Sequence, residues 1–389
     1  MEFRILGALL AWMLFQVTPL PPAVIAFFSP KSWELAKVAR ATAGYDLNAW
    51  LPLSIAPAAT LQRLLNVIPA MAAFVAVREM GRWWNGRRLW ILVAPVIAIA
   101  LLESLLAWGQ FYSVQASTEV RPVSGSYVNR NHFAGLLEMA LPLSLAWAIA
   151  IWGKASKREH RPARIALLTA NLLGIAAIIL AGVIGSLSRM GFAASLAGIA
   201  IVAIGWLVAR DRQAPVSRWL WLVPVLLPVV IVLFVSSNAM VLRFADGSET
   251  SGITADGRNL IWKETLRLIT AYPWTGTGLG AYEQGLYPFR TVAPAMTVDF
   301  AHNDYLQALA ELGLVGGAMA LAFAIWILWK PLSLALRPGS KRLTLCAGLV
   351  GAFLAIGLHS FVDFNLYIPA NALVLAWLAG IAVSPGLET

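Results

Sequence analysis

The stretch AHNDYLQALAELGLVGGAMALAFAIWILW, residues 301–329, changes from polar to apolar along its length. Its apolar part is long enough to cross the roughly 30 Å of hydrocarbon in a bilayer, which takes about 20 residues. A helix that only filled a membrane would gain nothing from His302, Asn303 and Asp304 at its start, or from Glu311 further in. We interpret the stretch as a membrane helix with a functional end.

The composition generalises this interpretation to the whole chain. Of its 389 residues, 59% are hydrophobic and only 12% are charged, which excludes an ordinary soluble domain. Apolar runs of membrane length indicate about ten spans. We therefore predict an all-α polytopic bundle forming one integral membrane domain over residues 1–389. The predicted spans are 5–28, 62–80, 89–110, 133–153, 165–187, 191–209, 219–236, 305–329, 343–360 and 369–385. Prolines near residue 20 predict a break in the first of these.

The basic residues indicate the orientation. With the N-terminus inside, most of the 29 Lys and Arg fall in short inner loops, as the positive-inside rule requires. Both termini are then cytoplasmic, and the net charge of +10 is a topology signal that need not mean nucleic-acid binding. The one cysteine, Cys346, lies in an apolar run and can form no internal disulfide.

Two outer loops are long. Residues 29–61 have mixed polarity and can form a short surface helix. Residues 237–301, before the third-last helix, form the longest non-membrane segment and the favoured place for substrate handling. Within that loop an apolar stripe predicts a helix from Asn259 to Thr270. The glycines of TGTGLG, residues 275–280, then require a turn, and because they follow no strand we reject a dinucleotide site.

Three of the four histidines fall at predicted outer ends of spans, each with polar neighbours. His132 follows Asn129, Arg130 and Asn131 in SGSYVNRNHFAG; His302 lies in AHNDY; His359 precedes Asp363 and Asn365 in HSFVDFNLYIPAN. Polar groups at membrane depth are costly and tend to mark a functional site. We expect one outward-facing polar chamber.

Arginines supply positive charge on the same side. Arg189, in GSLSRMGFAAS, lies at a predicted tight outer turn, while Arg258 and Arg290 bracket the helix and the glycine turn of the long loop. Guanidinium groups suit a diphosphate or a carboxylate. The alternative is that they meet lipid headgroups or surface carboxylates. Glu103, inside an apolar run, either pairs with such an arginine or extends toward water.

His302 has two interpretations. It either caps the helix or bridges to a carboxylate, or it does chemistry. A helix N-terminus and nearby arginines disfavour the imidazolium, so a neutral ring can take a proton from a hydroxyl. Asp304 or Glu311 could orient that ring, and the spacing favours neither. Glycines 313 and 316, three apart, are expected to leave one helix face bare for close approach.

These residues resemble a known family. His302-Asn303, nine residues, Gly313, two residues and Gly316 match the pattern H-[NSQ]-x9-G-x-x-[GTY] of O-antigen ligases and pilin oligosaccharyltransferases. SYVNRNHFAG, the SLSRMG turn, GRNLIWKETLRLITAYPWTGTGLGAY and HSFVDFNLYIPANA are similar to stretches of the same superfamily of ligases and polymerases. The resemblance runs from about residue 120 to about residue 375.

The resemblance implies a glycosyltransferase of the C type, without a metal or other cofactor, at the outer face of the bacterial inner membrane. It would pass a glycan from undecaprenyl diphosphate to lipid A-core, to a growing polysaccharide or to a protein hydroxyl. His302 would be the general base, and inversion at the anomeric carbon would follow. Arg189 and Arg258 would hold the diphosphate. The expected substrate-binding set is completed by Arg290, Asn303, Arg130, His132, His359 and Asp363.

The residues themselves also support the expectation that the protein uses no metal. Asp304, Glu311 and Asp363 are acidic candidates, but the outer face has no compact Asp-x-Asp, and arginines can supply a divalent ion's electrostatic effect. The predicted spans are fewer than in a typical ligase, which leaves the acceptor open between lipid A-core and a polysaccharide repeat.

Two other classes remain as alternatives. A transporter or flippase would bind a polyprenyl-linked or anionic solute without chemistry, and inverted repeats would favour it; we find none. A silent membrane scaffold would not need the complete histidine pattern. Glycosyl transfer in surface polysaccharide assembly is the interpretation that the sequence favours.

Overall fold

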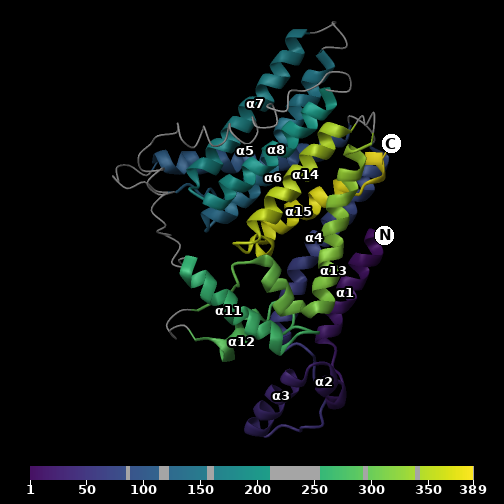
Figure 1. Ribbon diagram of the computed structural model, residues 1–389, viewed down its shortest axis with the longest axis vertical. Helices are drawn as coiled ribbons and strands as arrows, with labels where there is room; N and C mark the ends of the chain where they lie inside the picture. Colours follow the sequence, from purple (N-terminus) through teal and green to yellow (C-terminus); the bar gives the residue numbers. More distant parts are fainter. Residues whose placement is uncertain are drawn as a thin grey trace. The chain divides into compact units, whose positions relative to one another are not determined.

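The computed structural model describes residues 1–84, 88–113, 122–155, 162–210, 255–291, 297–337 and 342–388 (Figure 1). Over these residues the chain is helical, with one isolated bridge between Leu20 and Leu51, so the all-α prediction is confirmed. The helices are α1 Glu2–Val17, α2 Pro22–Phe28, α3 Pro30–Ala43, α4 Pro57–Trp83, α5 Leu89–Ser113, α6 Arg130–Ala155, α7 Pro162–Gly185, α8 Arg189–Arg210, α11 Ala255–Ala271, α12 Tyr282–Leu286, α13 Asp304–Ala335, α14 Leu343–His359, α15 Pro369–Ala382 and α16 Pro385–Glu388, with short 3-10 helices η3 Tyr287–Phe289 and η4 Asn365–Tyr367.

Within the described ranges, six helices are long and apolar enough to cross a membrane: α4, α5, α6, α7, α8 and α13. Each coincides with a predicted span. The spans predicted at 343–360 and 369–385 correspond to α14 and α15, which are apolar but shorter. The first predicted span is divided into α1 and α2, as its prolines require. The span predicted at 219–236 lies outside the described residues.

Both helices predicted within the two long loops are present. The surface helix expected within 29–61 is α3, and the helix expected from Asn259 to Thr270 is α11. Residues 237–254 and 292–296 of the long loop lie outside the described ranges.

The chain divides into two compact units. Unit 1 comprises Met1–Pro69, Glu249–Trp326 and Ser360–Phe364; unit 2 comprises Ala70–Ser248, Ile327–His359 and Asn365–Thr389. The assignment of one membrane domain, with a periplasmic loop over 237–301, stays a prediction.

A break in α13 organises unit 1. Gly313 has φ 66° and ψ −174°, so the helix is interrupted there and starts again. The glycine turn fills the interruption: Thr277 and Gly278 donate their N–H groups to the carbonyls of Ala310 and Glu311, at 2.9 and 3.0 Å. On the other side, Leu314 donates to Pro273 O at 2.8 Å. The backbone groups released by the break are thereby satisfied.

The break revises the role expected for the two glycines. Gly313 does not bare a helix face; a Cβ there would lie 2.3 Å from Trp274 O, so the residue allows the glycine turn to enter. Gly316 fits the expectation, because its own Cβ would lie 2.6 Å from the ring of Trp12 on α1. Trp12 Nε1 donates to Leu312 O at 3.0 Å. Contacts to both sides of the break therefore come from outside α13.

Two buried side chains complete this junction and explain the burial of Glu311. Gln16 of α1 donates to Thr275 O and Glu311 O at 2.8 and 2.9 Å, and its oxygen accepts the Leu279 N–H at 3.1 Å. The Glu311 carboxylate accepts from Gly280 N–H at 2.7 Å and from the Gln307 amide at 3.0 Å. Glu311 thus has a structural role, as buried carboxylates with several donors commonly do.

Unit 2 is a bundle around α6. This helix packs against α5, α7, α8, α14 and α15, and Figure 1 shows α6, α8 and α14 side by side. The contact between α8 and α14 uses two glycines: a Cβ on Gly351 would lie 2.7 Å from Gly198 O. Small residues allow this close packing of membrane helices.

Replacing Gly313 by alanine tests the break. A side chain would be forced into the left-handed region and against Trp274, so we expect a loss of at least about 2 kcal/mol of unfolding free energy. Gly7→Ala in α1, where an added Cβ meets nothing within 4 Å, is the matched control and should be neutral or slightly stabilising. Thermal unfolding in detergent measures both. Equal midpoints for the Gly313 variant and the native protein would contradict the break.

Candidate active site

In three of the polar stretches, a side chain caps the start of a helix in the same way. Asn129, Ser188 and Asn303 immediately precede α6, α8 and α13. Their side-chain oxygens accept backbone N–H groups of the first helical turn, from Asn131 at 2.8 Å, Gly191 at 3.2 Å, and Tyr305 and Leu306 at 3.0 Å each. Side-chain capping of this kind fixes where a helix starts. It also places a charged residue at the first helical position: Arg130, Arg189 and Asp304.

His302 has an unusual backbone. Its φ is 48°, in the left-handed region, which costs a non-glycine residue about 1–2 kcal/mol. The alternative in which His302 caps α13 is not what the structure shows, because Asn303 supplies the cap. Strained backbone persists only where the surroundings hold it, and such residues cluster at functional sites.

The His302 ring has two neighbours from residues 360–364. The ring lies edge-on to Phe364, with centroids 4.9 Å apart and planes at 78°. Its Nδ1 lies 3.9 Å from Oδ1 of Asp363, too far for a hydrogen bond, and makes no hydrogen bond to any described residue. The side chain is 17% exposed, whereas that of Asp363 is 1% exposed. A carboxylate thus faces one ring nitrogen while part of the ring remains accessible.

The two residues that the sequence offered for orienting the His302 ring, Asp304 and Glu311, have other partners. Asp304 Oδ2 accepts a hydrogen bond from Ser360 Oγ at 2.8 Å, and Glu311 belongs to the α13 junction. Asp363, which the sequence analysis did not consider as an orienting residue, is the acidic partner that the structure gives to His302.

Two predicted arginines lie in the same unit as His302. Arg258 is near the start of α11 and Arg290 follows η3; both are half-buried and both contact other groups. The segment after η3 is tied to α11 by the buried Glu264, whose Oε1 accepts the N–H and the hydroxyl of Thr291 at 2.5 and 2.7 Å. Glu264 therefore fixes the residue that follows Arg290.

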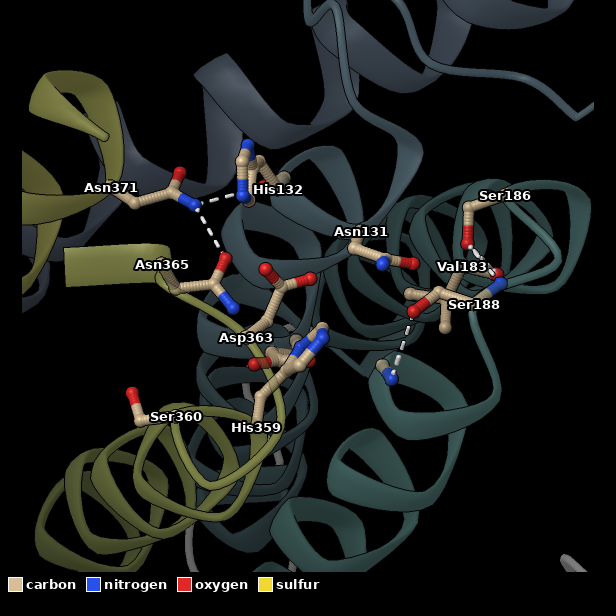
Figure 2. Close-up of polar contacts among 12 residues, drawn as sticks. Asn131, His132, Val183, Ser186, Ser188, His359, Ser360, Asp363, Asn365 and Asn371 are labelled. Carbon is tan, nitrogen blue, oxygen red and sulfur yellow. Dashed lines mark hydrogen bonds and ion pairs between the residues drawn. The ribbon is translucent and has the colours of Figure 1, made fainter. Parts of the chain in front are cut away.

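The turn carrying Arg189 is as tight as the sequence predicts, with α7 ending at Gly185 and α8 beginning at Arg189. Leu187 has φ 55°, the other non-glycine residue with positive φ among those described. Ser186 Oγ donates to Val183 O at 2.6 Å and accepts the Ser188 N–H at 3.1 Å (Figure 2). The turn is buried, while the Arg189 side chain is exposed.

A second polar cluster lies in unit 2, around Asn371 (Figure 2). Its Nδ2 donates to His132 O at 2.9 Å and to Asn365 Oδ1 at 3.0 Å, and its Oδ1 accepts the Tyr127 hydroxyl at 2.9 Å. Burial raises the pKa of Tyr127 well above its ordinary value, so the phenol remains a donor. The stretches SYVNRNH and HSFVDFNLYIPAN are thereby joined.

Two carboxylates of unit 2, the buried Glu138 and the half-buried Glu103, have partners that the sequence did not predict. His359 Nδ1 lies 2.9 Å from Oε2 of Glu138 on α6, with both side chains almost fully buried. Glu138 was missed, although a carboxylate inside an apolar run was its signal. Glu103 accepts the N–H and the hydroxyl of Ser126 at 2.9 and 2.6 Å, so its partner is a serine and not the arginine of the first alternative. Its extension toward water, the second alternative, stays a prediction.

The predicted site residues therefore fall into two groups. His302, Asn303, Asp363, Arg258 and Arg290 belong to unit 1, and Arg130, His132, Arg189 and His359 belong to unit 2. Their substrate-binding roles, and the single chamber expected to contain them, stay predictions. Among the described residues no three His, Cys, Asp or Glu side chains converge as metal ligands, and metal-free chemistry also stays a prediction.

Comparison with known proteins finds a family model that matches part of the chain. Residues 174–321 match the family model described as O-antigen ligase. No curated protein matches the chain. The matched segment includes Arg189, Arg258, Arg290 and His302 and confirms the resemblance to the O-antigen ligase and polymerase superfamily, a family of membrane enzymes.

A pair of substitutions tests the left-handed backbone at His302. Glycine adopts positive φ without steric cost, so His302→Gly should exceed His302→Ala in unfolding free energy by about 1 kcal/mol. Ala308→Gly, inside helix α13, is the control. It should lose about 1 kcal/mol of unfolding free energy, because glycine is ordinarily less stable than alanine within a helix. Thermal unfolding in detergent compares the three. A His302→Ala protein as stable as His302→Gly would show that the residue is not left-handed.

Proposed function

We propose that the protein moves a glycan from undecaprenyl diphosphate to an acceptor hydroxyl during surface polysaccharide assembly, as an O-antigen ligase or a repeat-unit polymerase. The family match over residues 174–321 and the six long apolar helices support this proposal. The site would face the periplasm from the inner membrane, with both termini in the cytoplasm. The charge distribution of the loops supports that orientation.

The observation that carries the proposal is the geometry of His302. Within a segment that matches an enzyme family, this histidine has strained backbone, a carboxylate facing Nδ1 and a partly accessible ring. A conformation that costs about 1–2 kcal/mol is found more often at functional sites than elsewhere, and His302 combines it with a facing carboxylate and an accessible ring. The features are those of a general base held in place before its substrate arrives.

The proton would move as follows. A neutral ring with its hydrogen on Nδ1, directed toward Asp363, presents the Nε2 lone pair to the acceptor. Nε2 takes the hydroxyl proton while the acceptor oxygen forms its bond to the anomeric carbon. The bond from that carbon to the diphosphate oxygen breaks, and the configuration inverts. Asp363 then stabilises the imidazolium, and Phe364 holds the ring plane.

The departing diphosphate needs its charge balanced. Arg258 and Arg290 belong to the same unit as His302, and Glu264 fixes the segment that carries Arg290. Guanidinium groups bind diphosphate oxygens through paired hydrogen bonds and cannot lose their charge. We propose that Arg258 holds the diphosphate, with Arg290 contributing to binding. The part expected of Arg189, which belongs to unit 2, stays a prediction. No separate general acid is then required, because a neutralised diphosphate leaves readily.

The acceptor would be lipid A-core for a ligase or a growing polysaccharide for a polymerase. Both would offer a sugar hydroxyl to the same base, so the chemistry at His302 would be identical. The roles of Asn303, Arg130, His132, His359 and Asp363 in substrate binding belong to the same proposal.

His302→Ala tests the proposal in a strain whose lipopolysaccharide and exopolysaccharide are both resolved on gels. Loss of a general base lowers turnover by roughly 100-fold or more. We therefore expect one polysaccharide to fall below detection, with lipid-linked donor accumulating on the outer face. Loss of capping on lipid A-core would identify a ligase, and single-repeat products would identify a polymerase.

His160→Ala is the matched control, since the sequence places His160 on the inner side. It should leave both polysaccharides at native levels. Intact polysaccharides of every kind in the His302→Ala strain would refute the proposal. Donor retained on the inner face would instead indicate transport.

A further inference from the structure

Two segments of unit 1 that are distant in sequence run alongside each other. Residues 300–305 lead into α13, and residues 360–364 follow α14. Their contacts occur in nearly opposite chain order, so that the second segment lies antiparallel to the first. The pairs are Phe300 with Phe364, His302 with Phe364 and Asp363, Asp304 with Ser360, and Tyr305 with Phe361.

The polar part of this pairing is a double hydrogen bond, which we call the clasp. Asp304 donates its N–H to Ser360 O at 2.9 Å, and Ser360 donates its hydroxyl to Asp304 Oδ2 at 2.8 Å. Both residues are buried, at 3% and 1% exposure. A hydrogen bond to a charged acceptor in such a setting is stronger than one between neutral groups.

Aromatic contacts support the clasp at both ends. The rings of Phe300 and Phe364 stack with centroids 4.1 Å apart and planes at 7°. Tyr305 and Phe361 lie with centroids 4.5 Å apart. The segment 360–364 is thus fixed against 300–305 on either side of Ser360.

His302 lies between backbone groups that are individually held. Its predecessor, Ala301, donates to Gln307 Oε1 at 2.6 Å, and the Ala301 carbonyl accepts from Trp262 Nε1 at 3.0 Å. On the other side, Asn303 caps α13 and Asp304 is held by Ser360. Strain at one residue persists when its neighbours cannot relax, and the clasp prevents relaxation on the C-terminal side.

We propose that Ser360 and Asp304 are positioning residues for His302. The clasp holds the left-handed turn, and because the same five-residue segment carries Asp363 and Phe364, it also sets the imidazole against the carboxylate and the ring. The catalytic consequence rests on the proposed function. The positional consequence does not, because it concerns only where the imidazole lies.

The ring nitrogens of His302 report the position directly. The chain has only four histidines, so 15N-histidine labelling of the full protein in detergent gives a countable spectrum, and His302→Gln assigns the His302 signals. Ser360→Ala removes the hydroxyl of the clasp and should shift those signals beyond their linewidth. Asp304→Asn keeps an acceptor oxygen for the Ser360 hydroxyl but removes the charge, so it should shift the signals less than Ser360→Ala does.

Ser144→Ala is the matched control. Ser144 is also buried, and its hydroxyl bonds only to Leu141 O within α6. It should leave the His302 signals unchanged. If Ser360→Ala fails to fold, Ser360→Cys keeps the volume with a weaker donor and should shift the signals in the same sense.

Activity separates this inference from the proposed function. Misplacing a catalytic group by about 1 Å costs up to roughly 100-fold, so Ser360→Ala should lower the polysaccharide made in the native strain by roughly tenfold or more. Unmoved His302 signals in Ser360→Ala would overturn the clasp, whatever happens to the polysaccharide. Shifted signals together with normal polysaccharide in His302→Ala would support the clasp and overturn the enzymatic proposal instead.

Discussion

The left-handed backbone of His302 can exist only because residues on both sides of it are immobilised. Trp262 of α11 and Gln307 of α13 hold Ala301, while Ser360 holds Asp304. Three segments that are separate in sequence therefore converge on one residue. The helix that follows is itself anchored, because the glycine turn and Gln16 occupy the break at Gly313. The position of the imidazole depends on this set of contacts.

Side-chain capping of a helix start explains why several of the polar stretches have similar sequences. In three of them the side chain of one residue caps a helix, and a charged residue follows at once. Capping fixes the helix start, and the start fixes the direction in which the next side chain leaves the backbone. Membrane helices that begin in this way have charged groups at the ends of the spans, where the cost of desolvating a charge is lowest.

Hydrophobic runs predicted the membrane helices well, because a span of about 20 apolar residues has few alternatives in a bilayer. Local signals also predicted α11 and the turn before Arg189. The break at Gly313 was not predicted, since a glycine in an apolar run is compatible with a continuous helix. The break accompanies the close approach of the Trp274 and Gly276 backbones to Gly313, a contact that the local sequence does not encode.

The sequence also did not predict which residues far apart in the chain contact each other. Asp363 as the neighbour of His302, Glu138 as the partner of His359, and Ser360 as the partner of Asp304 all join segments far apart in the chain. Periodicity and spacing describe one segment at a time, so they identified the polar residues without pairing them. The paired residues give the His302 site its orientation.

Chemical rescue tests the general-base role of His302 most directly. His302→Gly leaves a space beside Asp363 and tolerates positive φ. In membranes that contain the lipid-linked donor, added imidazole should restore glycan transfer to His302→Gly and should leave an Arg258→Ala protein inactive. Transfer by His302→Gly at the native rate without imidazole, or a folded His302→Gly protein that imidazole never restores, would contradict that role.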